Sequence, residues 1–105
     1  MIHHLVLFKL KPEADDETLE WMMRETRIQL LKIPEVLSIR CGKRIDPESP
    51  WPFFLAVEIE SREKLALFMS DPNHIKFRDE VIIPHVAKQV VLDYEMEPGK
   101  DVRYS

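Results

Sequence analysis

The sequence predicts a single α+β domain with a four-stranded antiparallel sheet and two helices on one face of that sheet. Three observations support this prediction: strand-like alternation of apolar residues, apolar residues at helical spacing, and Pro- or Gly-containing breaks between these segments. The strand-like segments are residues 2–10, 36–41, 53–60 and 85–94, and the main helical segments are residues 17–32 and 62–69. Their order is strand, helix, strand, strand, helix, strand, which is typical of the ferredoxin-like βαββαβ fold.

The chain length suits one domain, because 105 residues fall within the common range of about 100–150 residues for a single domain. We expect this domain to cover residues 1–96. The remaining residues, 97–105, are mainly polar and are expected to form a C-terminal tail.

The first strand is predicted to be central in the sheet. One face carries Ile2, His4, Val6, Phe8 and Leu10, and the other carries His3, Leu5, Leu7 and Lys9. Both faces are largely apolar, as expected for a strand that is covered on both sides.

The last strand has apolar residues on both faces as well, whereas the two helices cover only one side of the sheet. Because soluble proteins usually bury a large apolar sheet face in an interface, we predict a homodimer through the open sheet face.

The helices show recognisable beginnings and ends. Asp15 or Asp16 lies where the first helix favours negative charge, and Pro34 disfavours helical geometry in the residue before it. Ser61 can cap the second helix. The residues of this helix that are predicted to point inward are Leu65, Phe68 and Met69. The sequence Asp71-Pro72 breaks that helix, a short helix is expected over residues 74–82, and Pro84 precedes the last strand.

The third strand follows a proline-rich loop and has one apolar face. Three of the eight prolines fall in the loop between the second and third strands. The third strand is expected to place on one face Phe53, Leu55, Val57 and Ile59.

Composition argues against several classes of partner. Lys and Arg total 15 against 19 Asp and Glu, and both signs are interspersed, so there is no basic patch for nucleic acid or an anionic membrane. The N-terminal apolar run is too short for a signal peptide or a transmembrane helix. Cys41 is the single cysteine, which excludes an intrachain disulfide and fits a reducing compartment, so a cytoplasmic location is expected.

Several segments resemble one family. They are HLVLFKLKPE near the start, IPEVLSIRCGK after the first helix, DPNHIKF after the second, and VVLDYE near the end. In their order and spacing over residues 2–96, they are similar to stress-responsive A/B barrel domains, the Dabb family. The resemblance implies a ferredoxin-like monomer that pairs into a dimeric α+β barrel. It does not imply one activity, since many members have no known role.

One member of this family is a plant polyketide cyclase that closes an aromatic ring without a cofactor. The resemblance implies that His74 matches its catalytic base and that His4 matches a second residue of its site. A tyrosine assists catalysis in that enzyme, and Phe68 occupies the matching position here, so the hydroxyl is missing.

For His74, two interpretations remain open. An imidazole with an ordinary pKa near 6.5 can move protons at neutral pH, which favours a general base. A histidine after Pro72 can equally cap or pack at a turn. His4 lies on an apolar strand face and is either a core histidine or a partner of His74 in a catalytic pair.

No cofactor or metal is predicted. The histidines and nearby carboxylates lack the close spacing of known metal motifs. The side chains expected nearest a cavity are apolar, namely Phe8, Phe54, Phe68, Phe77 and Ile82. They suggest a pocket for a small hydrophobic molecule.

Three hypotheses about function therefore remain. The preferred one is a small homodimeric A/B barrel protein of undefined biochemical role that binds a small hydrophobic molecule. The alternative is a cofactor-independent enzyme, similar to a polyketide cyclase or acting on another small aromatic substrate, with His74 as general base. The third is a purely structural protein with a filled interior.

Overall fold

The structure is a computed structural model, and it describes residues 1–97 of the chain. The strands are β1 (Ile2–Leu10), β2 (Val36–Lys43), β3 (Phe53–Ile59) and β4 (Val86–Glu95). The helices are α1 (Asp16–Leu30), α2 (Arg62–Ser70), α3 (Pro72–Phe77), the π-helix η1 (Arg78–Ile82) and α4 (Ile83–His85). The predicted tail lies outside the described residues except for its first residue, Glu97.

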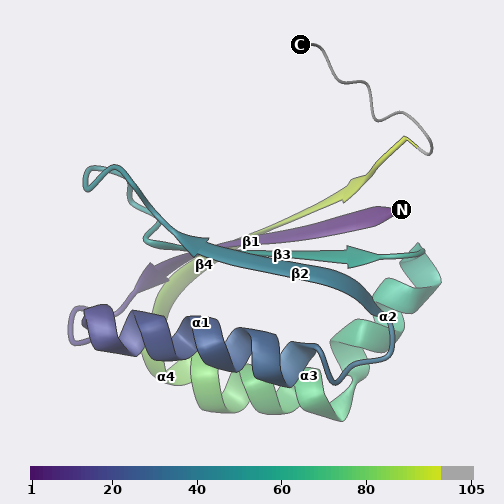
Figure 1. The fold of residues 1–105 in the computed structure, drawn as a ribbon, viewed down its shortest axis with the longest axis horizontal. Helices are drawn as coiled ribbons and strands as arrows, with labels where there is room; N and C mark the ends of the chain where they lie inside the picture. Colours follow the sequence, from purple (N-terminus) through teal and green to yellow (C-terminus); the bar gives the residue numbers. More distant parts are fainter. Residues whose placement is uncertain (98–105) are drawn as a thin grey trace.

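The four strands form one antiparallel sheet in the order β2-β3-β1-β4. The predicted ferredoxin-like arrangement is confirmed, and so is the central position of β1, which pairs with β3 on one side and β4 on the other. Figure 1 shows α1, α3 and α4 along one side of the sheet. No helix among residues 1–97 is long and apolar enough to cross a membrane.

The helix beginnings follow local hydrogen bonding. Asp15 is the N-cap of α1, and its carboxylate accepts from the backbone N–H of Thr18 at 2.8 Å. Ser61 caps α2 in the same way, with its hydroxyl oxygen 3.2 Å from the backbone nitrogen of Lys64. Each side chain satisfies a backbone N–H that has no partner within its helix.

The helical segment after α2 is longer than predicted. It begins at Pro72 and continues through Pro84 to His85, so β4 begins one residue later than expected. A proline is tolerated in the first turn of a helix, and Pro84 is at such a position in α4. The π-turn η1 comes immediately before it, with the N–H of Ile83 bonded to the carbonyl of Arg78, five residues back.

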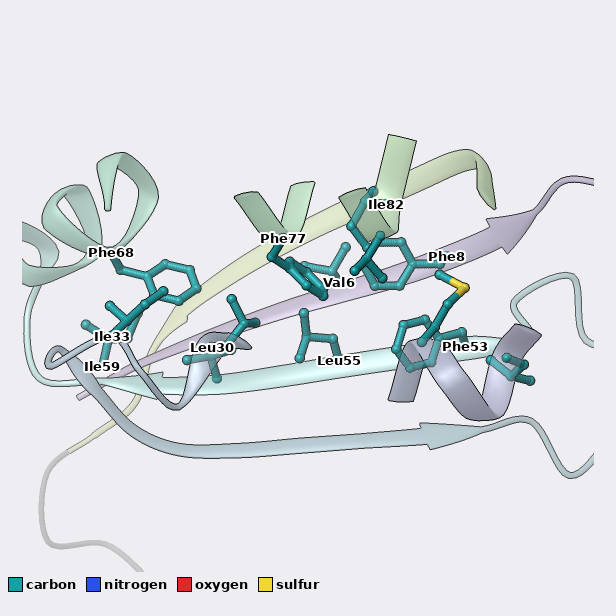
Figure 2. Close-up of a cluster of buried hydrophobic side chains, with 14 of the residues drawn as sticks. Val6, Phe8, Leu30, Ile33, Phe53, Leu55, Ile59, Phe68, Phe77 and Ile82 are labelled. Carbon is teal, nitrogen blue, oxygen red and sulfur yellow. The ribbon is translucent and has the colours of Figure 1, made fainter. Parts of the chain in front are cut away.

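The core lies between the sheet and the helices. It includes Phe53, Leu55, Val57 and Ile59, so the predicted inner face of β3 is confirmed. Figure 2 shows Phe68, Phe77 and Ile82 reaching from the helical side towards sheet residues that include Val6 and Leu55. The rings of Phe8 and Phe53 stack at a centroid distance of 5.1 Å. Met69, which was predicted to point into the core, is instead 45% exposed near the end of α2, and it only borders a cavity at the edge of the core.

The opposite sheet face is also apolar. It carries side chains that are only partly buried in the single chain, namely Leu5, Leu7, Phe54, Ala56, Val90 and Leu92. We call these six residues the open-face cluster. Their parity follows from the register, in which Leu5 pairs with both Ala56 and Leu92.

Candidate functional site

His74 is held in place by the break between α2 and α3. Asp71 is the N-cap of α3, and its carboxylate accepts from the backbone N–H of Asn73 at 2.8 Å. Pro72 follows in the first turn, where its fixed φ favours helix geometry. These two residues fix the direction of α3 and place His74 in its first turn, on the side of the sheet that contains the core.

His4 receives its partner from the edge strand. The register of β1 and β4 places His4 directly across from Asp93, on the helix-facing side of the sheet. The Nδ1 atom of His4 lies 2.5 Å from the Oδ1 atom of Asp93. The His4 side chain is 5% exposed and that of Asp93 is 43% exposed, so the carboxylate connects a buried ring to the surface.

This hydrogen bond has a chemical consequence. A carboxylate can only accept, so the Nδ1 atom of His4 carries the proton in the bond. In the neutral ring the other nitrogen, Nε2, then has the free electron pair and can accept a proton.

Phe68 lies beside both imidazoles. Its ring centroid is 4.8 Å from that of His74 and 5.7 Å from that of His4. Phe68 is 1% exposed, so both imidazoles contact a buried, apolar ring. The aromatic ring supplies no hydroxyl at this position.

The environment of His74 favours its neutral form. Burial is the main cause that lowers the pKa of His74 below 6.5, and the nearby charges of His4 and Arg78 act in the same direction. The Nδ1 atom of His74 is buried and has no hydrogen-bond partner among the described residues. A buried polar atom without a partner costs free energy, and such atoms are uncommon in native structures.

Both histidines line one cavity of about 160 Å³ between the sheet and the α2–η1 segment. The apolar part of its wall consists of Val6, Phe8, Leu30, Leu55, Phe68, Met69, Phe77, Ile82 and Val91. The polar part consists of His4, His74, Arg78 and Gln89. Gln89 and Val91 are exposed residues on the edge strand β4, so the cavity opens between this strand and the helices.

Six of the seven residues proposed from the sequence therefore lie together around the cavity: His4, Phe8, Phe68, His74, Phe77 and Ile82. Phe54 does not belong to this group. It lies on the opposite face of β3, in the open-face cluster, because neighbouring strand residues point to opposite sides. Its parity relative to Phe53 and Leu55 already indicated this position.

Asp93 was not among the residues proposed for the site. An aspartate near the end of a strand suggests a role at the sheet edge, and nothing local connects it with a histidine 89 residues away. The contact could have been predicted only from the fold, because the first and last strands of this arrangement are neighbours in the sheet. Within residues 1–97, no group of three or more His, Cys, Asp or Glu side chains is placed to hold a metal ion.

Solved structures confirm the fold. A Dabb protein with a ferredoxin-like fold from Mesorhizobium loti is 22% identical with a TM-score of 0.80, covering 91% of this chain and 96% of that one. A dimeric ferredoxin-like protein of unknown function from Thermobifida fusca is 17% identical with a TM-score of 0.81, covering 90% of both chains. The hydroxynitrile lyase from Passiflora edulis is 18% identical with a TM-score of 0.81, covering 92% of this chain and 94% of the lyase.

The sequence comparisons identify the family. A stress-response A/B barrel domain-containing protein of Arabidopsis thaliana is 30% identical over 96 residues, which are 90% of this chain and 36% of that protein. This chain thus spans about a third of the length of the curated relative that it matches. The family model for the stress responsive A/B barrel domain matches residues 2–96. The chain belongs to the stress-responsive A/B barrel (Dabb) family.

Proposed function

We propose that the protein binds a small, mainly hydrophobic molecule in the cavity and catalyses a proton transfer on it without a cofactor. The observation that carries this proposal is the hydrogen bond between His4 and Asp93 at the wall of an apolar cavity that His74 also lines. A base with a fixed tautomer beside a bound molecule is the arrangement that general acid–base catalysis requires.

The two histidines have different roles in this proposal. His4 is the base, because Asp93 holds its ring and leaves Nε2 free to take a proton from an acidic C–H or O–H group. His74 is neutral at pH 7, since its pKa is lowered mainly by burial. Its N–H group donates a hydrogen bond, or the proton itself, to the substrate oxygen on which negative charge develops. The roles are therefore the reverse of those in the hypothesis from the sequence, in which His74 is the base and His4 is its partner.

The apolar wall sets the substrate class. Nine of the thirteen residues around the cavity are apolar, and the volume of about 160 Å³ resembles that of an engineered apolar cavity of about 150 Å³ that binds benzene. A substrate with one aromatic ring or a short acyl chain and a carbonyl group fits both properties. The reaction class is abstraction of a proton next to that carbonyl, which includes aldol-type ring closure and its reverse.

A binding protein without catalysis is the second candidate. It is favoured by Phe68, which provides no hydroxyl between the two imidazoles, and by the unpartnered Nδ1 atom of His74. In that case the histidines would orient a ligand by hydrogen bonds and no bond would break. Binding is common to both candidates, and proton exchange distinguishes them.

The proposal includes a homodimer through the open-face cluster. Six apolar side chains on one sheet face remain only partly buried in the single chain, and some relatives of the same fold are dimeric. Pairing two such faces would remove this apolar surface from water. The cavity lies on the other side of the sheet, so dimerisation leaves its opening at β4 accessible.

The test is deuterium exchange of the methyl protons of acetophenone in D2O, followed by NMR. We expect the protein to accelerate exchange well beyond free imidazole at equal concentration. His4→Gln should reduce the protein-dependent rate by about 10²-fold or more, within the range for loss of a general base. The control is His85→Gln, because His85 contacts Trp21 and does not line the cavity.

Two results separate the candidates. If acetophenone shifts the NMR signals of cavity residues but exchanges no faster than with free imidazole, the protein binds without catalysis. If acetophenone neither shifts these signals nor exchanges, the proposed ligand class is wrong.

A further inference from the structure

Arg78 introduces a positive charge at the cavity opening. It begins η1 and follows His74 by four residues, a spacing that places two helical residues on the same face. Arg78 lines the cavity together with Gln89 of β4, which faces the helices from the edge strand. The lowered pKa of His74 has the Arg78 charge among its causes, so the guanidinium is close enough to act on the imidazole.

The guanidinium retains donors for a ligand. Its Nε atom lies 3.0 Å from the Oδ1 atom of Asp79, and the two side chains are 53% and 51% exposed. Ion pairs this exposed contribute little to stability. Among the described residues, no hydrogen bond occupies the two terminal nitrogens of Arg78. A planar guanidinium with free terminal N–H groups matches a carboxylate, which it can bind through two parallel hydrogen bonds.

The charges around the cavity favour an anion. Arg78 is the single Lys or Arg among the described residues that line the cavity, and no Asp or Glu is among them. Three carboxylates close to these lining residues already have partners. Asp93 is bonded to His4, Asp79 is paired with Arg78, and Asp71, whose charge acts on His74, accepts from the backbone N–H of Asn73. An apolar cavity with one permanent cation at its opening suits an apolar body with one negative charge at its end.

We infer that Arg78 determines ligand specificity and that the preferred ligand of the cavity is a small carboxylate with one aromatic ring or a short acyl chain. The inference rests on the proposed function, because it concerns the same cavity. It adds a charge requirement that the two histidines alone do not impose. In this arrangement the apolar body lies against Phe8 and Phe77, and the carboxylate lies at the guanidinium.

The test compares benzoate with benzamide, which has nearly the same shape and no charge. Both are titrated into the full-length protein at pH 7.5, and dissociation constants are measured from protein NMR shifts. We expect benzoate to bind more tightly than benzamide. Arg78→Gln should weaken benzoate binding about tenfold, the scale of one charge-assisted contact, and weaken benzamide binding much less, because the amide carries no charge.

Two further variants sharpen the test. Arg62→Gln is the matched control, because it also removes an arginine from an exposed ion pair, here with Glu95, and Arg62 does not line the cavity. It should leave benzoate binding unchanged. Asp79→Asn removes the carboxylate that competes for Arg78, so it should strengthen benzoate binding severalfold.

The outcomes distinguish this inference from the proposed function. Equal affinities for benzoate and benzamide in the unaltered protein would overturn the role of Arg78 while leaving a hydrophobic binding site intact. This comparison needs no variant, so a poorly folded Arg78→Gln protein cannot obscure it. If benzoate, benzamide and acetophenone all leave the cavity signals unshifted, the proposed function fails together with the inference.

Discussion

At the scale of single residues, Asp93 defines the chemical state of His4. A buried histidine with no partner could exist in either neutral form, and the Nε2–H form would leave the wrong nitrogen free for the proposed reaction. The carboxylate selects the Nδ1–H form through one hydrogen bond across neighbouring strands. Asp93 is therefore a positioning residue in the proposed mechanism.

The tautomer can be measured without knowing the substrate. In the unaltered protein, ring nitrogen NMR shifts of His4 should report the Nδ1–H form. Asp93→Ala removes the acceptor and should shift the ring towards the Nε2–H form. His3 is a matched internal control, because its ring nitrogen is 3.8 Å from Glu58 and it points to the opposite face of β1 from His4. An unchanged His4 spectrum in the variant would contradict the positioning role.

His74 predicts a pH dependence of stability. Burial keeps its native pKa below 6.5, so the unfolded chain binds the proton more readily than the folded one does. The free energy of unfolding should therefore fall as the pH decreases through 6.5 towards the lower native value, and His74→Gln should reduce this fall. Urea unfolding at pH 7.5 and 5.0 measures both slopes. Equal pH dependence in the two proteins would show that His74 titrates normally.

At the scale of secondary-structure elements, the turn between α2 and α3 sets the direction of α3 and so the position of His74. Its geometry is local, since Asp71 caps α3 and Pro72 fixes the first turn. The π-turn that follows carries Arg78 at its start and Ile82 at its end, and both line the cavity. Single π-turns are often found at functional sites, because they change the direction of the side chains around them.

The capping role of Asp71 gives a prediction with a conservative control. Asp71→Ala should lower the free energy of unfolding by about 1 kcal/mol, the usual cost of losing an N-cap. Asp71→Asn keeps an acceptor for the backbone N–H of Asn73 and should cost clearly less. Chemical denaturation measures both values. Equal destabilisation by the two substitutions would indicate that the charge of Asp71, and not its cap, is important.

At the scale of the whole molecule, the sheet separates the two proposed functions. Its helix-facing side holds the cavity and both histidines, and its other side carries the open-face cluster. The two faces come from alternate residues of the same strands, as His4 and Leu5 illustrate. Substitutions at neighbouring strand positions can therefore affect the proposed assembly and the proposed ligand binding separately.

The proposed dimer can be tested at this scale. Leu5→Glu places a charge at the centre of the open-face cluster, where pairing would bury it, and should give a monomer. Leu31→Glu is the control, because Leu31 follows α1 and is already 58% exposed. Light scattering at micromolar concentration measures the molar mass of each variant. A stable monomer of the unaltered protein would contradict the proposal.

The sequence by itself determined the order of the elements, their caps and the faces of the strands. These properties depend on interactions between residues that are close in the chain, such as the cap by Ser61 or the alternation from Phe53 to Ile59. The same alternation shows that Phe54 belongs outside the cavity, so that residue was predictable from its neighbours. The continuation of the helical segment through Pro84 was less so, because Pro84 falls in a first turn that begins only after η1.

Only the tertiary structure decided the composition of the site. The contact between His4 and Asp93 joins residues 89 positions apart, and it depends on the register of two strands that meet when the sheet closes. The position of Arg78 at the cavity opening depends on how the fold places the π-turn across the cavity from β4. Local patterns contain neither relation, because both arise from packing between distant segments.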